Sequence, residues 1–321
     1  MDRRDFIAGL TAGVLGIGTA GAQSPACLMP KLTLFVPTPS GGGWDNIARA
    51  MNAALNDGRL VDAIDLINQP AGAAHGLMEF IERYKDKGDA LLISGAGMIG
   101  ASIMARTPAD LTGLTAISRL TTEYMIVGVA TDSSYADLPA LIAALRQYPA
   151  EMAVAGGVLG STDQVLAAMV AREAGLRGNQ LTYRPYVGGL GALQDVIDGG
   201  SAFAVGGLSE MQASISGGRI RPLAISSTQR LPGVGIPTFL EQGANIVLAN
   251  WRGVFAPKDI SAEQTALLRQ VVERMTQSIS WQATLFQYNW SSYYLTGDAF
   301  TAFVREETSR VRRLLAELGL T

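Results

Sequence analysis

The stretch from Leu32 to Asp45 constrains the fold of this chain most, because an apolar run passes through three successive glycines directly into a helix. Ile47, Met51 and Leu55 then recur at helical spacing, which predicts an amphipathic helix. A strand followed by a helix in this way presents the unpaired N–H groups and the positive dipole end of the helix at one edge of a sheet. The sequence therefore predicts an α/β fold with a loop suited to a carboxylate or a phosphate.

The glycine loop matches neither of the familiar phosphate-binding motifs. No Lys-Ser or Lys-Thr pair follows the glycines, as a Walker A loop requires, and the spacing is not G-x-G-x-x-G. A tight strand-to-helix turn that binds nothing is the alternative interpretation of this stretch taken alone.

The same order of strand, small-residue loop and helix recurs along the chain. After the first unit, further strands of such units are expected at 64–67, 90–94, 151–155, 181–183 and 202–205. The first three units correspond in order to the last three, which predicts two α/β lobes of like topology. Ligands of open α/β sheets bind beyond the carboxyl ends of the strands, so we expect the site in the cleft between the lobes.

Four other segments complete the expected architecture. Segments rich in β-branched residues are expected to cross between the lobes as strands at 122–130 and 245–255. Apolar residues at helical spacing predict helices that cover the first lobe at 262–275 and 300–318.

Charge and cysteine content exclude several classes of protein. The net charge is −3 and no run of Lys or Arg occurs, which disfavours nucleic-acid binding. The single Cys27 excludes disulfide scaffolds and thiolate metal clusters within the chain. We expect neither a cofactor nor a bound metal.

Residues 1–22 have the pattern of an export signal. Arg3 and Arg4 precede a glycine-rich, weakly apolar run that ends in Ala20-Gly21-Ala22, as in a twin-arginine signal with a small-residue cleavage site. Asp2 stands where Ser or Thr is usual, so the ordinary secretory route stays open. The apolar run is too short and too rich in glycine to span a bilayer. The mature chain is therefore predicted to be exported to the periplasm and soluble.

Four motifs together resemble the solute receptors of tripartite tricarboxylate transporters, also called Bug-type receptors. They are the segments Pro39–Asp45, Asn68–Ala74, Pro185–Gly189 with Gly199-Gly200 behind it, and Trp251–Pro257. The resemblance implies a two-lobed, periplasmic-binding-protein-like (Venus flytrap) fold with two crossing strands. On that fold, lobe one comprises 28–124 and 251–321, and lobe two comprises 125–250.

The resemblance also implies a function. Receptors of this family close over a small carboxylate and deliver it to a membrane permease, so we expect a monomeric, non-enzymatic binding protein. A tricarboxylate such as citrate is favoured by the Gly-Gly-Gly-Trp-Asp form of the first loop. Two alternatives are a receptor that reports to a membrane signalling partner and an exported enzyme that acts on an anionic substrate.

Carried over to this chain, the family pattern implies ligand contacts from glycine loops of both lobes. In lobe one these are Ser40, Gly41, Gly42, Gly43, Trp44, Asp45, Ser94, Ala96 and Gly97. In lobe two they are Ser161, Thr162, Asp163, Gly188 and Gly189. The chain departs from the family in two places, which bears on the contacts of the second lobe. Many members have Ser or Thr followed by His where this chain has Ser161-Thr-Asp-Gln164, and many have Lys before the paired glycines where this chain has Val187.

Individual residues have competing interpretations. Asp45 lies in the first helical turn, where a carboxylate that holds the loop amides is favoured over direct ligand contact. Trp44 either lines the pocket or packs beneath the loop. Arg184 is a candidate bidentate partner for a ligand carboxylate, or else a solvated surface charge. His75, the only histidine, has no nucleophile motif beside it, so we expect no catalytic role.

Overall fold

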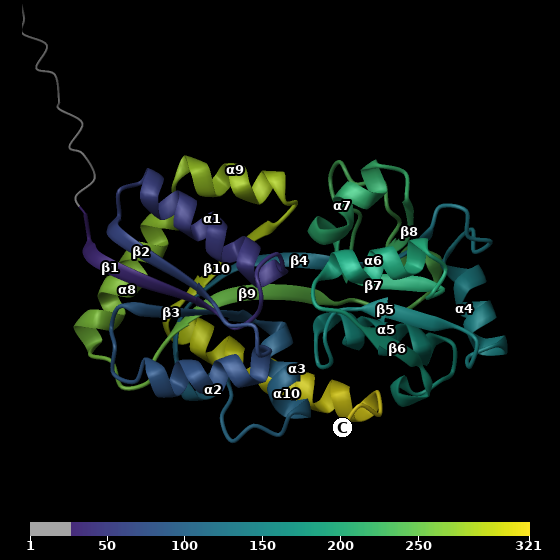
Figure 1. Cartoon of the computed structure of the whole chain (residues 1–321), viewed down its shortest axis with the longest axis horizontal. Helices are drawn as coiled ribbons and strands as arrows, with labels where there is room; N and C mark the ends of the chain where they lie inside the picture. The colour runs from purple at the N-terminus through teal and green to yellow at the C-terminus, as the bar shows by residue number, and fades with distance from the viewer. Residues whose placement is uncertain (1–26) are drawn as a thin grey trace, which may run out of the picture.

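The computed structural model describes residues 27–321, so the predicted export signal lies outside the described residues. Its strands form one curled, mixed sheet in the order β2-β1-β3-β9-β4-β7-β5-β6, with β8 and β10 paired to β4. Figure 1 shows two lobes, each with helices on both sides of its part of the sheet, joined by β4 and β9. The two-lobed α/β fold expected from the repeated units is confirmed.

Lobe one contains the three predicted strand, loop and helix units. Its parallel strands are β1 (Met29–Val36), β2 (Val61–Asn68) and β3 (Ala90–Gly95), with β1 between the other two. The helices that follow them are α1 (Gly43–Asp57), α2 (Ala73–Arg83) and α3 (Ala96–Met104). The expected apolar face of α1 is buried, including Ile47, Met51 and Leu55.

Lobe two repeats this arrangement. Its parallel strands are β5 (Ala153–Gly156), β6 (Thr182–Pro185) and β7 (Phe203–Gly207), with β5 in the middle as β1 is in lobe one. The helices that follow them are α5 (Thr162–Glu173), α6 (Gly189–Ile197) and α7 (Leu208–Ser216). The helix α4 (Leu138–Gln147) precedes β5. The carboxyl ends of both sets of strands carry the glycine loops.

Two antiparallel strands connect the lobes, as the sequence predicts. β4 (Thr115–Ala130) pairs with β9 (Ala249–Ala256) from Thr115 to Tyr124, and then continues along β7 and β8 (Ile220–Ile225). Within the part that pairs with β9, residues 118–122 of β4 also pair with β10 (Ser291–Thr296). β4 is therefore a single strand shared by both lobes.

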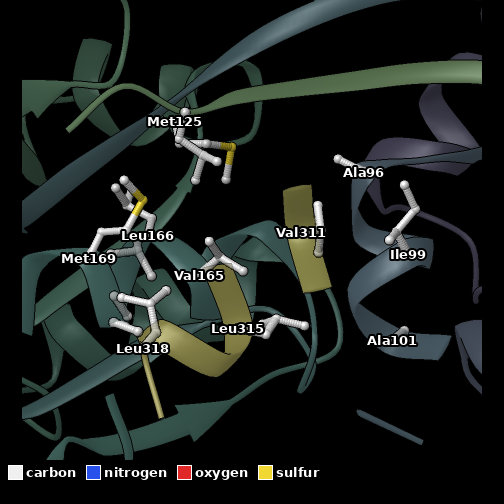
Figure 2. Packing of buried hydrophobic residues seen from close by; sticks show 14 of the residues in the cluster. Ala96, Ile99, Ala101, Met125, Val165, Leu166, Met169, Val311, Leu315 and Leu318 are labelled. Carbon is white, nitrogen blue, oxygen red and sulfur yellow. The ribbon is translucent and has the colours of Figure 1, made fainter. Parts of the chain in front are cut away.

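The C-terminal helices do more than cover lobe one. α8 (Ala262–Thr276) and α9 (Ile279–Gln287) pack there, with α9 on α1. The long α10 (Gly297–Glu317) also reaches lobe two, where the Gly178 amide donates a hydrogen bond of 2.8 Å to the Leu318 carbonyl. Figure 2 shows Val311 and Leu315 of α10 between α3 of lobe one and the Val165 and Leu166 side chains of α5. One buried apolar cluster thus extends through both lobes.

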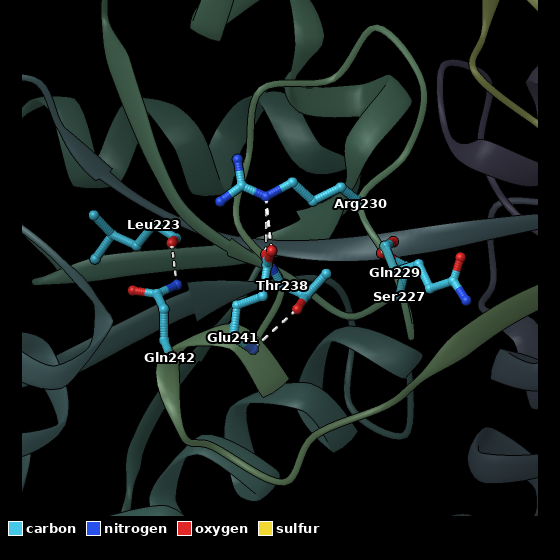
Figure 3. Close-up of polar contacts among 7 residues, drawn as sticks. All are labelled: Leu223, Ser227, Gln229, Arg230, Thr238, Glu241 and Gln242. Carbon is cyan, nitrogen blue, oxygen red and sulfur yellow. Dashed lines mark hydrogen bonds and ion pairs between the residues drawn. The ribbon is translucent and has the colours of Figure 1, made fainter.

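The chain between β8 and β9 is fixed by local polar contacts (Figure 3). Glu241 accepts hydrogen bonds from the Thr238 amide at 2.7 Å and from Arg230 Nε at 2.9 Å. Gln242 donates through Nε2 to the Leu223 carbonyl at 2.7 Å. Short 3₁₀ turns are found at Leu111–Gly113, Gly178–Gln180 and Leu240–Gln242. Across residues 27–321, no helix combines the length and the apolar character that a membrane span needs.

Candidate functional site

The first glycine loop is held in place by a carboxylate at the start of α1. Gly41 has a φ of +92°, which favours glycine, and its amide donates to Asp45 Oδ2 at 2.9 Å. Asp45 also accepts hydrogen bonds from Arg49 Nε at 2.7 Å and from Asn68 Nδ2 at 3.0 Å. Burial raises the pKa of Asp45, but these hydrogen bonds outweigh it and lower the pKa overall. Asp45 therefore holds the loop and α1 together as an ionised group.

Lobe two uses the same device at the start of α5. The Gly157 amide donates to Asp163 Oδ2 at 2.6 Å, in the position that Gly41 and Asp45 occupy in lobe one. The N-cap of this helix is Ser161, whose Oγ accepts from the Gln164 amide at 3.4 Å, and the helix begins at Thr162. Unlike Asp45, Asp163 is not in an ion pair within the described part of the chain. Burial, and then repulsion from Glu210, raises its pKa to about 8.

A cavity of about 310 Å³ opens between these two loops. It is lined by loops and helix starts of both lobes and by the crossing strand β9. Its lobe-one residues are Thr38, Pro39, Ser40, Gly41, Gly42, Gly43, Trp44, Pro70, Gly72, Ala73, Gly97 and Ala101. Its remaining residues are Gly157, Val158, Ser161, Thr162, Asp163, Tyr186, Val187, Gly188, Gly189, Leu190, Glu210, Asn250 and Arg252. This volume suits a ligand of metabolite size.

A buried ion pair lies at this cavity, where the crossing strands meet. Arg252 of β9 places Nη2 2.5 Å from Glu123 Oε2 of β4, and the two side chains are 3% and 0% exposed. The other oxygen of Glu123 accepts from the Ser209 amide at 2.7 Å, which ties the pair to α7. The guanidinium also lies over the Trp290 ring, 5.5 Å from its centroid. The pair therefore joins both strands to lobe two.

Arg252 also determines what fits beside it in the first loop. A Cβ on Gly43 would lie 2.6 Å from Arg252 Nη2, so only glycine leaves room there for the guanidinium. Among the described residues, Arg252 Nη1 has no hydrogen-bond partner although it is buried. Such an unsatisfied charged donor is costly unless a ligand or water satisfies it.

Glu210 brings another carboxylate to the cavity, from the first turn of α7. Burial, and then repulsion from Glu123, raises its pKa, whereas Arg252 and the amides of Gly207 and Gly43 lower it. Since Gly43 belongs to lobe one, this side chain lies close to the loop of the opposite lobe. The cavity thus has the carboxyl groups of Asp163 and Glu210 on its lobe-two side. The Gly43 amide and the Arg252 guanidinium lie near Glu210.

The mouth of the cavity is apolar. Val187 and Leu190 of lobe two line it and are 70% and 74% exposed, which is unusual for side chains of this size. Trp44 lines the opposite side and also packs against the buried clusters. Trp44 therefore both lines the cavity and packs against the core, which are the two roles considered from the sequence. A ligand with an apolar portion would cover these surfaces.

The structure brings most of the predicted site residues together around the cavity. Lining it are Ser40, Gly41, Gly42, Gly43, Trp44, Gly97, Ser161, Thr162, Asp163, Gly188 and Gly189. Four others lie elsewhere. Asp45 is behind the loop, Ser94 is fully buried in β3, Ala96 is at a small adjacent void, and Arg184 forms an ion pair of 3.3 Å with Asp195. His75 is exposed on α2 and is not among the lining residues.

Sequence reasoning missed the charged groups Glu123, Glu210 and Arg252. A signal was available, since each predicted crossing strand contains a single charged residue, negative in one and positive in the other. Two opposite charges in adjacent buried strands predict an ion pair. Glu210 follows Gly206-Gly207, in the position of the other glycine loops. Within residues 27–321 no group of three or more His, Cys, Asp or Glu side chains is placed to hold a metal ion.

Comparison with known proteins gives a consistent result. The model of the family described as "Tripartite tricarboxylate transporter family receptor" matches residues 62–320. Protein BugT of Bordetella pertussis is 26% identical over 313 residues, covering 94% of this chain and 95% of that protein.

Solved structures agree on the fold. A TctC solute-binding protein from Polaromonas, without ligand, is 25% identical with a TM-score of 0.68, covering 90% of this chain and 98% of that one. The R. palustris protein Rpa4515, solved with adipate, is 24% identical with a TM-score of 0.77, covering 90% and 97%.

Proposed function

This chain belongs to the tripartite tricarboxylate transporter receptor family, and we propose from this that it captures a small carboxylate in the interlobe cavity and delivers it to the membrane permease of such a transporter. The observation that carries the proposal is the cavity itself, where glycine loops of two like lobes converge. Backbone amides at helix starts and the Arg252 guanidinium are donors for carboxylate oxygens. The adipate in the R. palustris neighbour supports a carboxylate ligand.

The identity of the carboxylate is a finer question. A tricarboxylate such as citrate stays the prediction of the sequence resemblance. The acidic groups at the cavity, Asp163 and Glu210, bear on this choice, because a ligand with several negative charges would meet repulsion there.

The binding proposal is tested by thermal unfolding of the mature protein with a panel of acids that includes citrate, succinate, adipate and their amino derivatives. A ligand that binds only the folded state raises the melting temperature in proportion to ln(1 + [L]/Kd). We expect a rise with at least one acid and its loss in the Arg252→Met variant. No shift with any acid, together with no small molecule in native mass spectra, would refute the proposal.

Delivery, location and assembly are parts of the same proposal. We propose a periplasmic, monomeric and non-enzymatic receptor. Cell fractionation with N-terminal sequencing of the mature chain tests export and cleavage near Ala22. Uptake of labelled ligand by cells with and without the chain tests delivery. Recovery of the bound acid unchanged after prolonged incubation separates a receptor from an enzyme.

A further inference from the structure

The charges around the cavity do not balance. Three carboxylates, Glu123, Asp163 and Glu210, and one cation, Arg252, lie at or beside it. Arg252 is committed to Glu123 through Nη2. In the part of the chain that the structure describes, Asp163 and Glu210 have no ion-pair partner. Buried carboxyl groups without a cation keep a proton instead, and a cationic ligand can replace that proton.

Asp163 has free capacity for such a partner. Its residue is 9% exposed, and its Oδ2 accepts the Gly157 amide. No hydrogen bond reaches its Oδ1 within residues 27–321. Glu210 lines the same cavity from the start of a different helix. The N-terminal ends of α5 and α7 favour negative charge at both positions, so both groups ionise readily once a cation arrives.

An independent observation points to a ligand anion at the same cavity. The Arg252 side chain is 3% exposed, and its Nη1 is buried with no hydrogen-bond partner among residues 27–321. Arg252 itself lines the cavity. A carboxylate oxygen is the usual partner of such a guanidinium nitrogen. Within the described part of the chain, the cavity thus combines a guanidinium that has an unsatisfied nitrogen with two carboxylates that have no ion-pair partner.

We propose that the ligand is an aminocarboxylate, with its carboxylate at the first glycine loop on the Arg252 side of the cavity, and its cationic nitrogen between Asp163 and Glu210. The proposal rests on the proposed function, because it concerns the ligand of the same cavity. A ligand of this class gives Asp163 and Glu210 a shared cation and places its carboxylate on the Arg252 side of the cavity. A di- or tricarboxylate of similar size places negative charge beside Asp163 or Glu210 and leaves them without a cation.

Aminocarboxylates and plain carboxylates are expected to differ in whether their binding releases protons or takes them up. Burial and Glu210 raise the pKa of Asp163 to about 8, Glu123 adds to this, and the Gly157 amide and Arg252 oppose it. The Tyr183 phenol also faces Asp163 and is itself raised in pKa by burial and by that carboxylate. Asp163 therefore holds a proton near neutral pH. A cationic nitrogen displaces this proton, so its affinity rises with pH, whereas a purely anionic ligand favours the protonated site and binds more weakly as pH rises.

The test is calorimetric titration of the mature protein at pH 6.0, 7.5 and 9.0 with acids that differ only in an amino group. The pairs are aspartate with succinate, glutamate with glutarate, and 4-(aminomethyl)benzoate with 4-methylbenzoate, and citrate and adipate are added. We expect the amino member of at least one pair to bind at least tenfold more tightly than its partner, with an affinity that rises from pH 6.0 to 7.5.

Two neutral variants of matched shape test whether Asp163 and Glu210 cause the preference for the amino member of each pair. Asp163→Asn and Glu210→Gln should each reduce the preference for the amino member at least tenfold and flatten the pH dependence. Asp198→Asn, which removes an exposed acid of lobe two outside the cavity, should change neither. If one variant fails to fold, the other variant and the wild-type pH dependence still decide.

Failure of this proposal is distinct from failure of the proposed function. If citrate, adipate or the other plain acids bind as tightly as the amino acids or more tightly, with affinity that falls as pH rises, the aminocarboxylate is refuted and the receptor stands. If no acid of either kind binds at any pH, the proposed function fails, and the ligand class fails with it.

Discussion

Arg252 Nη2 lies 2.5 Å from Glu123 Oε2, so the two strands that join the lobes carry opposite charges that meet out of contact with solvent. In the strand register Arg252 lies opposite Thr121 and Glu123 lies opposite Asn250, so the ion pair is diagonal across β4 and β9. Replacing one partner of a buried ion pair leaves the other charge buried and unpaired, which destabilises the protein more than replacing both partners.

We therefore predict that Arg252→Met lowers the free energy of unfolding by about 3–5 kcal/mol, and that adding Glu123→Gln restores part of this loss. Urea unfolding of the two single variants and the double variant measures the coupling. The exposed pair Lys31–Asp65, at 2.7 Å, is the control, and Asp65→Asn should cost less than about 1 kcal/mol. Equal losses at the buried and exposed pairs would contradict the prediction.

The contact between α3 and the loop before α5 should control how closely the lobes approach. A Cβ on Gly100 would lie 2.2 Å from the Gly160 carbonyl oxygen, which belongs to the other lobe. We predict that Gly100→Ala separates the lobes, increases the radius of gyration in solution scattering and weakens ligand binding about tenfold, or ~1.4 kcal/mol. Gly97→Ala is the control for the scattering, since its Cβ would meet Trp44 at an ordinary 3.7 Å. An unchanged scattering curve for Gly100→Ala would show that the backbone adjusts locally.

The stability of the unliganded protein should fall as pH rises from about 4 towards 8. The pKa of Asp163 is raised from 3.8 to about 8 by burial and by Glu210, so over this range the folded protein keeps a proton that the unfolded chain has released. The resulting slope is at most about 1.4 kcal/mol per pH unit for one group. Asp163→Asn should flatten the slope in urea unfolding at pH 5–9, and Asp198→Asn should leave it unchanged. A wild-type slope that survives in Asp163→Asn would assign it to other groups.

The shared core around α10 predicts that one C-terminal side chain stabilises both lobes. Leu315 is fully buried in the cluster that includes α3 and α5 (Figure 2). We predict that Leu315→Ala lowers the free energy of unfolding by about 2–5 kcal/mol, whereas Glu317→Ala at an exposed position changes it by less than about 0.5 kcal/mol. Chemical unfolding followed by circular dichroism makes the comparison. A loss below 1 kcal/mol would mean that the helix end packs loosely.

The sequence predicted what depends on local pattern. The strand, glycine loop and helix units could be read in both lobes because each has an apolar run, small residues and helical periodicity in that order. The strands β8 and β10 and the helices α4 and α9 were not predicted. β10 is an edge strand whose Tyr293 is exposed, and its pairing with β4 depends on residues far away in sequence. Such pairing leaves little local signal.

The same distinction holds for the site. Sequence reasoning can identify Gly41, Gly188 and Ser161, because their positions require a particular backbone conformation or a helix cap. Arg184 and Arg252 are both arginines at strands, and only tertiary structure shows that Arg184 pairs with Asp195 and that Arg252 enters the cavity. Which charge becomes buried depends on the packing of both lobes, and spacing in the sequence does not encode it.

The hydrogen bond from Gly178 to Leu318 has a practical consequence for anyone who labels this protein. Leu318 thus adds a third connection between the lobes beside β4 and β9, so a bulky fusion or immobilising tag attached next to it would disturb that connection. Fluorophores and surface linkages belong instead on the exposed faces of α4 or α8, away from that connection.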